Sequence, residues 1–155
     1  MKKTILLLSL LSITIVTKES ENNKSIVLDK NKVFHAVCFS MIDYESQFIA
    51  DTTNKNSDAV GLVQTRCIMV DEINRKFKFK KYTYEDRLNP VKSYQMLLDF
   101  QLFYNKERNL EKTAKTWHGG PNGMYKTSTI GYWNQIKLRL KNRLTPLEYT
   151  FFIGL

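Results

Sequence analysis

The chain has 155 residues, enough for one domain of ordinary size with a buried core. Apolar residues make up 43% and charged residues 25%, a balance that is typical of a globular protein and excludes extensive disorder. The formal net charge of +9 suits a polyanionic partner, whether nucleic acid, an anionic membrane or an acidic cell-wall polymer.

The first residues have the pattern of a secretory signal peptide. Lys2 and Lys3 precede an unbroken run of Ile, Leu, Val, Ser and Thr over 5–16. This run is shorter than a bilayer span, which takes about 20 residues. We therefore expect a signal peptide over 1–17, with an uncleaved anchor as the alternative, and then a polar linker over 18–29.

Export affects the choice of partner. Without residues 1–16 the net charge is still +7, so the basic character belongs to the mature domain. We expect the protein in the periplasm, the cell envelope or outside the cell. Nucleic acid then drops in rank as a partner, and no stable membrane insertion is expected after signal cleavage.

The first predicted helix begins after a capping Asp29 or Asn31 and runs to about Ile49. At 100° per residue, one arc of this helix carries Phe34, Val37, Cys38, Met41, Glu45 and Phe48. A carboxyl group on an apolar face keeps its proton to a higher pH than the reference of about 4.3, so Glu45 is a candidate general acid. The alternative is a helix-end Glu that reaches solvent or a lysine.

The rest of the chain reads as helices joined by loops, with no credible sheet, so the predicted fold class is all-α. The predicted elements are a loop over 51–58, a helix over 59–75, a basic connector over 76–81, a helix from Asn89-Pro90 to about 104, a helix over 110–117, a helix after Thr127 to Thr129 that carries Tyr132 and Trp133, and an apolar tail over 146–155. The domain proper spans 30–145. We expect the tail to pack back on it.

The two cysteines, Cys38 and Cys67, both lie in apolar helical patterns. An oxidising compartment would allow them to form a disulfide. Two buried, unpaired thiols that act as small hydrophobic residues are the preferred interpretation.

Three motifs follow one another along the chain: Glu45-Ser46-Gln47-Phe48, Gly61-Leu62-Val63-Gln64 and the loop over 117–123, Trp-His-Gly-Gly-Pro-Asn-Gly. In this order they resemble the lytic transglycosylase family, whose lysozyme-like enzymes cut bacterial peptidoglycan, and the related goose-type lysozymes. The similarity reaches from about Val33 to Leu140. It implies a lysozyme-like domain of about five or six helices around a glycan-binding groove.

The resemblance also implies a reaction. Glu45 would be the single catalytic acid and base, cutting the MurNAc-GlcNAc bond to leave a 1,6-anhydro end, or hydrolysing it as a goose-type muramidase does. No metal or cofactor would be needed, and the partner would be peptidoglycan glycan strands bound by a monomer. A catalytically silent glycan-binding module and a cationic membrane-disrupting protein are the alternatives.

The resemblance assigns roles to further residues. Ser46 and Gln64 match family residues that bind substrate. Trp117 stands where the family usually has Tyr, and His118 where it has Asn, so Trp117 would offer a face for sugar stacking and His118 would tune the pH optimum or replace an amide hydrogen bond. Asp58 is a possible second carboxylate that would hold a hydrolytic water, with helix capping as its alternative.

Overall fold

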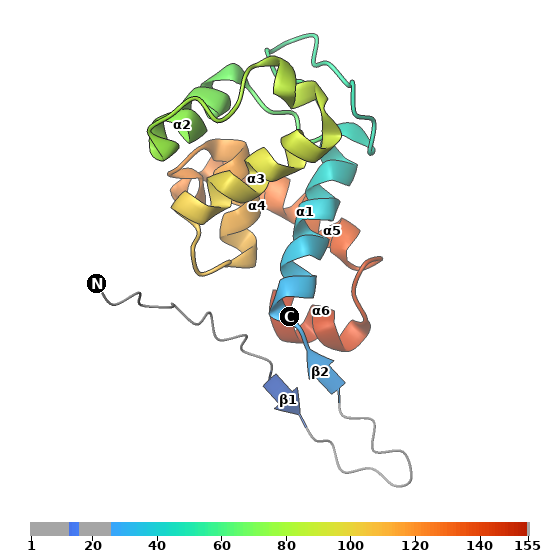
Figure 1. Ribbon diagram of the computed structural model, residues 1–155. Helices are drawn as coiled ribbons and strands as arrows, with labels where there is room; N and C mark the ends of the chain where they lie inside the picture. The colour runs from blue at the N-terminus through green and yellow to red at the C-terminus, as the bar shows by residue number, and fades with distance from the viewer. Residues whose placement is uncertain (1–12, 16–25, 155) are drawn as a thin grey trace, which may run out of the picture.

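The computed structural model describes residues 13–15 and 26–154, and the chain there is mainly helical (Figure 1). The predicted all-α class is confirmed. The helices are α1 Lys30–Ser46, α2 Cys67–Phe77, α3 Pro90–Tyr104, α4 Leu110–Gly119, α5 Ile130–Leu140 and α6 Pro146–Ile153, with short 3-10 turns η1 Glu85–Leu88, η2 Gly123–Tyr125 and η3 Thr127–Thr129. No helix of the described residues is long and apolar enough to cross a membrane.

Two short strands were not predicted. β1 (Ile13–Ile15) pairs antiparallel with β2 (Ile26–Leu28), with Ile13 opposite Leu28. β1 lies within the expected signal peptide. The rest of that segment, and most of the expected linker, lie outside the described residues.

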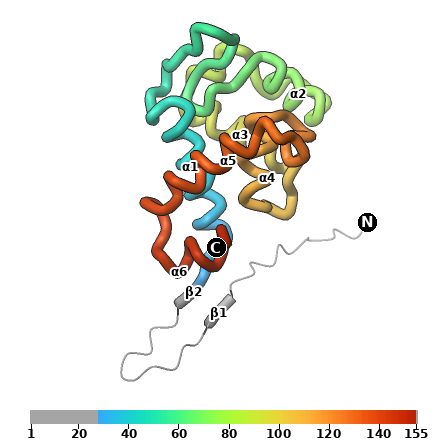
Figure 2. The backbone as a smooth tube through the Cα atoms, turned by 180° about the vertical axis from the view of Figure 1, so that it is seen from behind, coloured from blue at the N-terminus to red at the C-terminus, as the bar shows by residue number. Residues whose placement is uncertain are grey.

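Helix α1 lies against α4, α5 and α6, whereas α2 packs on α3 (Figures 1 and 2). Helix α1 begins where the Asp29 side chain accepts a hydrogen bond from the Asn31 amide, and it ends at Gln47, whose backbone is left-handed with a φ of 52°. Val33, Val37 and other apolar residues of α1 are fully buried in the core shared with α3, α4 and α5. This packing fixes the end of α1, where Glu45 and Ser46 lie.

The predicted helix over 59–75 begins only at Cys67, so its first half is wrong. Residues before it form a tight turn in which Val60 bridges Thr53 and Thr65. Gly61 has a φ of 82°, and a Cβ there would lie 1.9 Å from the Arg87 carbonyl oxygen. A helix cannot accommodate this conformation, and only glycine allows the close approach of the two backbones. The basic connector over 76–81 contains no strand, as predicted.

Helices α3 and α4 start where predicted because both have capping asparagines. Asn89 accepts hydrogen bonds from two amides of α3, with Pro90 at the first helical position, and Asn109 accepts one from Lys112 of α4.

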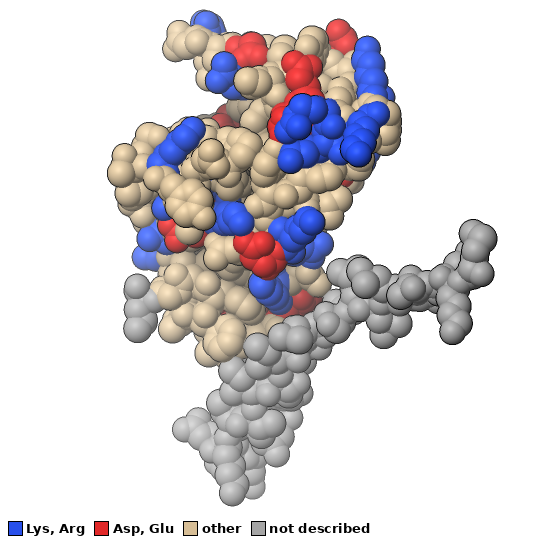
Figure 3. Space-filling model, turned by 90° about the vertical axis from the view of Figure 1, so that its left-hand side faces the viewer, with Lys and Arg blue, Asp and Glu red and all other residues tan. Residues whose placement is uncertain are grey.

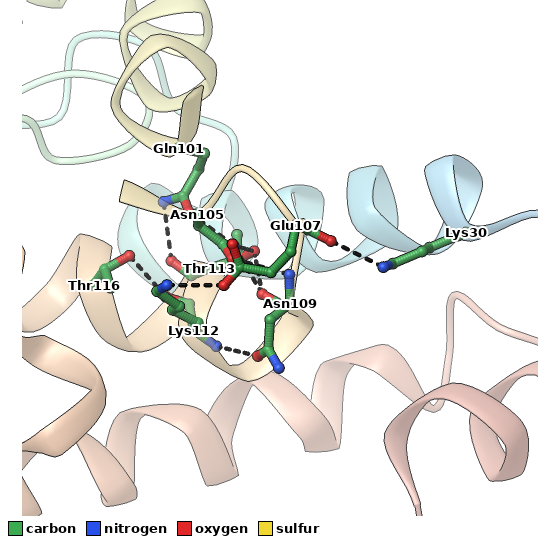
Figure 4. A network of polar contacts seen from close by, with 8 residues as sticks. All are labelled: Lys30, Gln101, Asn105, Glu107, Asn109, Lys112, Thr113 and Thr116. Atoms are coloured by element: carbon green, nitrogen blue, oxygen red, sulfur yellow. Dashed lines mark hydrogen bonds and ion pairs between the residues drawn. The ribbon is translucent and has the colours of Figure 1, made fainter. Parts of the chain in front are cut away.

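The turn between α3 and α4 is held by a buried polar network (Figure 4). At its centre the Asn105 side-chain amide donates to the Asn109 carbonyl at 2.9 Å and to the Thr113 hydroxyl at 2.8 Å. The Asn105 side-chain oxygen accepts from the Asn109 amide at 2.9 Å. One buried side chain thus satisfies groups on both sides of the turn.

The apolar tail forms α6 and packs back on the domain. Thr145 and Glu148 make a reciprocal capping box at its start. The buried Glu148 carboxylate also pairs with Lys32 of α1 at 2.6 Å. Both cysteines are free thiols, as preferred. Cys38 is buried as predicted, whereas Cys67 is partly exposed, so the prediction of burial is wrong for that residue.

Candidate functional site

Glu45 lies in the last turn of α1 and is partly buried. Burial raises the pKa of its carboxyl group to about 7, and the nearby Tyr132 hydroxyl opposes this shift. The carboxyl group therefore keeps its proton to a higher pH than an ordinary Glu does. The alternative of a helix-end Glu that reaches solvent is therefore wrong, because the Glu45 side chain is partly buried.

Tyr132 of α5 is the residue that sequence reasoning missed. The sequence predicts only that Tyr132 lies on a helix. Its hydroxyl is buried beside Glu45, and it has no hydrogen-bond partner of ordinary geometry among the described residues. Burial and the Glu45 charge raise the Tyr132 pKa well above its usual value. The hydroxyl beside the Glu45 carboxyl therefore belongs to Tyr132 of α5. Trp117, at the position where the resembled family usually has Tyr, has no hydroxyl to offer.

His118 completes this group of side chains. Its ring stacks on the Tyr132 ring, with 4.2 Å between centroids and 11° between planes. Partial burial lowers the pKa of His118 and so favours the neutral form of the imidazole. Glu45, Tyr132 and His118 therefore form one array that links α1, α5 and the end of α4.

Trp117 does not offer a face for sugar stacking, which corrects that expectation. The side chain is 5% exposed, and its indole N–H donates to the Val63 carbonyl at 2.9 Å. Its ring meets Phe100 edge to face. The indole has a core position that ties α4 to the turn over 61–64.

Ser46 and Gln64 also make structural contacts. The buried Ser46 hydroxyl donates to the Leu62 carbonyl at 2.7 Å, which leaves no hydroxyl proton for a ligand. The Gln64 amide donates to the Thr52 and Gly61 carbonyls at 3.1 and 3.0 Å, from a residue whose φ is 50°. Both side chains hold the 61–64 turn in place, and their predicted part in substrate binding remains a prediction.

Asp58 bonds the start of α2 from a distance along the chain, although the N-cap residue of that helix is Arg66. Its carboxylate accepts from the Cys67 amide at 2.7 Å, at the start of α2, and pairs with Arg66 at 2.8 Å. The Arg66 hydrogen bond is the main reason that the Asp58 pKa falls to about 2. The role of Asp58 as a second carboxylate remains a prediction.

A cavity of about 490 Å³ lies between α2 and the loop after α4. Its walls are mostly apolar, and Glu45 is not among the lining residues, which are Ile68, Met69, Asp71, Glu72, Arg75, Phe100, Tyr104, Gly120 and Pro121. The acid and this cavity are therefore separate features. In the described part of the chain, no group of three His, Cys, Asp or Glu side chains is arranged to hold a metal ion.

Beside Glu45 the surface carries two exposed aromatic rings covered by arginines. Tyr44 is 40% exposed and Phe48 is 48% exposed. The Arg139 guanidinium lies 4.9 Å from the Tyr44 ring centroid, and that of Arg143 lies 5.3 Å from the Phe48 centroid. Asp43 is 3.7 Å from Arg139 and 3.5 Å from Arg143. We call these five residues the aromatic–arginine patch.

Neither a protein-family model nor a curated protein sequence matches the chain. A solved structure shares its fold, the crystal structure of Aeromonas hydrophila PliI in complex with Meretrix lusoria lysozyme. The match has a TM-score of 0.54 and 20% sequence identity, and it covers 69% of this chain and 87% of the other. At this identity the likeness establishes the fold alone.

This comparison does not support the prediction of a peptidoglycan-cleaving transglycosylase. The description of the matched structure names PliI and a lysozyme, and no transglycosylase. The comparison therefore does not support describing the protein as a lytic transglycosylase, a lyase or a glycosidase. The family resemblance of the three motifs remains a prediction.

Proposed function

We propose that the protein is an exported binding protein whose partner is a lysozyme. The aromatic–arginine patch carries this proposal, because Tyr, Phe and Arg are the side chains that protein interfaces concentrate at their centres. The matched structure is a complex of PliI with a lysozyme, and this supports the choice of partner.

The patch is ordered before any partner arrives. Asp43 lies close to both arginines, and each guanidinium lies over a ring, so these long side chains lose less conformational freedom on binding than free ones would. Phe48 follows the end of α1 in a left-handed conformation, with a φ of 65°, which turns the chain away from the helix. Two rings and two cations are thus presented together next to Glu45.

The test is isothermal titration of the protein with Meretrix lusoria lysozyme. We expect binding, and we expect Phe48→Ala to weaken it about tenfold or more, as truncation of a central interface aromatic does. Phe79→Ala is the matched control, because it removes an exposed phenyl ring, 60% accessible, from the segment after α2. Its affinity should equal that of the unaltered protein.

Two results would overturn the proposal. One is an absence of binding, or binding that Phe48→Ala leaves unchanged. The other is release of soluble muropeptides from peptidoglycan by the protein alone, followed by mass spectrometry and abolished in Glu45→Gln.

A further inference from the structure

The segment between α2 and η1 presents an exposed phenyl ring between two lysines. Lys78, Phe79 and Lys80 are all exposed, and Phe79 is 60% accessible. We propose that this three-residue tip binds the surface of an anionic phospholipid membrane. The proposal does not depend on the proposed lysozyme partner, because the tip and the aromatic–arginine patch share no residue.

The tip is held rigidly by the residues on either side of it. Phe77 packs edge to face on Phe103 of α3, with ring centroids 5.0 Å apart. Lys81 pairs with the buried Asp99 at 2.6 Å, and the Asn74 side-chain oxygen accepts from the Lys81 and Tyr82 amides. The segment therefore cannot fold Phe79 inward without breaking contacts on both sides.

Charge favours an anionic surface. Arg75 and Lys81 pair with Glu72 and Asp99, whereas no ion pair within residues 26–154 engages Lys78 or Lys80. Glu85 lies near Lys80. The pKa of the Glu85 carboxyl is lowered mainly by hydrogen bonds from its own backbone and from Thr83, and the Lys80 charge adds a smaller contribution. Figure 3 shows lysine and arginine side chains over the upper part of the molecule, with acidic side chains among them and further basic side chains below.

The phenyl ring selects a membrane over a soluble polyanion. A solvated polymer of phosphates or carboxylates offers no apolar layer to receive an exposed ring. The interface of a bilayer takes up aromatic side chains while its anionic headgroups attract flanking lysines. The arrangement is that of an interfacial anchor, because the ring lies between the charges and not on a separate face.

The experiment is sedimentation of the full chain with phosphatidylglycerol vesicles, phosphatidylcholine vesicles or soluble polyphosphate. We expect binding to phosphatidylglycerol alone among the vesicles, about fivefold weaker in Phe79→Ala and about fivefold weaker in Lys78→Ala. Glu85→Gln should strengthen it, since it removes a negative charge beside Lys80.

Leu102→Ala and Lys55→Ala are the matched controls, because each removes an exposed apolar or basic side chain elsewhere on the surface. Circular dichroism of every variant checks that it is folded. Unchanged binding of Phe79→Ala to phosphatidylglycerol refutes the proposal. So does binding to polyphosphate with none to vesicles, which would assign the lysines to a soluble polyanion.

Discussion

The carboxyl of Glu45 should lower the stability of the protein at neutral and alkaline pH. Its pKa is about 7 in the folded protein, against about 4.5 for an ordinary Glu. Between these two values the folded state binds more protons than the unfolded state, so the free energy of unfolding falls as pH rises through that window. At pH values below this window Glu45 is protonated in both states, so its ionisation does not lower the free energy of unfolding there.

The magnitude follows from the size of the shift. At 1.36 kcal/mol per pKa unit, a rise from 4.5 to about 7 corresponds to about 3 kcal/mol. The side chain is only partly buried, so screening by solvent reduces the effect to about 2 kcal/mol. Glu45→Gln has no charge to gain and should remove this loss. Between pH 4 and pH 8, the free energy of unfolding of the variant should therefore rise by about 2 kcal/mol relative to that of the unaltered protein.

Urea unfolding at pH 4 and pH 8 measures this difference, with the fluorescence of the buried Trp117 and Trp133 as the signal. The gain corresponds to a shift in the midpoint of about 1 M urea at pH 8 relative to pH 4. Glu107→Gln is a control of opposite sign, because Lys112 lowers the pKa of that exposed carboxyl. Equal effects of Glu45→Gln at the two pH values would refute a raised pKa at this position.

Three further predictions concern the scaffold. Asn105→Ala should reduce the free energy of unfolding by about 2 kcal/mol, measured by urea unfolding, because it leaves the buried network of the α3–α4 turn unsatisfied. Gly61→Ala should cost about 3 kcal/mol or more in thermal unfolding, whereas Gly131→Ala in α5, where a Cβ meets nothing within 4 Å, should be neutral or gain up to about 1 kcal/mol. Iodoacetamide at pH 8 should alkylate Cys67 before Cys38 in the folded protein, as read by mass spectrometry of peptides, because burial raises the Cys38 pKa to about 12.

The sequence predicted correctly the helix starts that depend only on neighbouring residues. Asp29, Asn89 and Pro90 mark helix starts by satisfying or removing amide donors in the first turn, and these starts were predicted. The failure at 59–66 has a long-range cause. Gly61 meets the Arg87 backbone, and a contact between residues so far apart has no trace in helical periodicity. The strand pairing of 13–15 with 26–28 was missed for the same reason.

The candidate site was predicted in part. The helical arc placed Glu45 on an apolar face, and that placement accounts for its raised pKa. The arc could not show that Tyr132 of another helix would face it, or that the indole of Trp117 would donate to Val63 inside the core. Side chains that meet across two helices depend on how the helices pack, and the spacing within each helix does not determine this.

The error in function has a physical origin as well. Packing α5 against the end of α1 is enough to desolvate Glu45, so a carboxyl with a pKa near 7 follows from the fold whether or not a substrate is ever bound. Ser46 and Gln64, which match a substrate-binding pattern, bond carbonyls of their own turn and are required by the same packing. Motifs that a fold needs in order to close can therefore persist in proteins with different activities. The aromatic–arginine patch is different in kind, because it brings two exposed aromatic rings and two arginines together on one surface, which is the combination that protein interfaces concentrate.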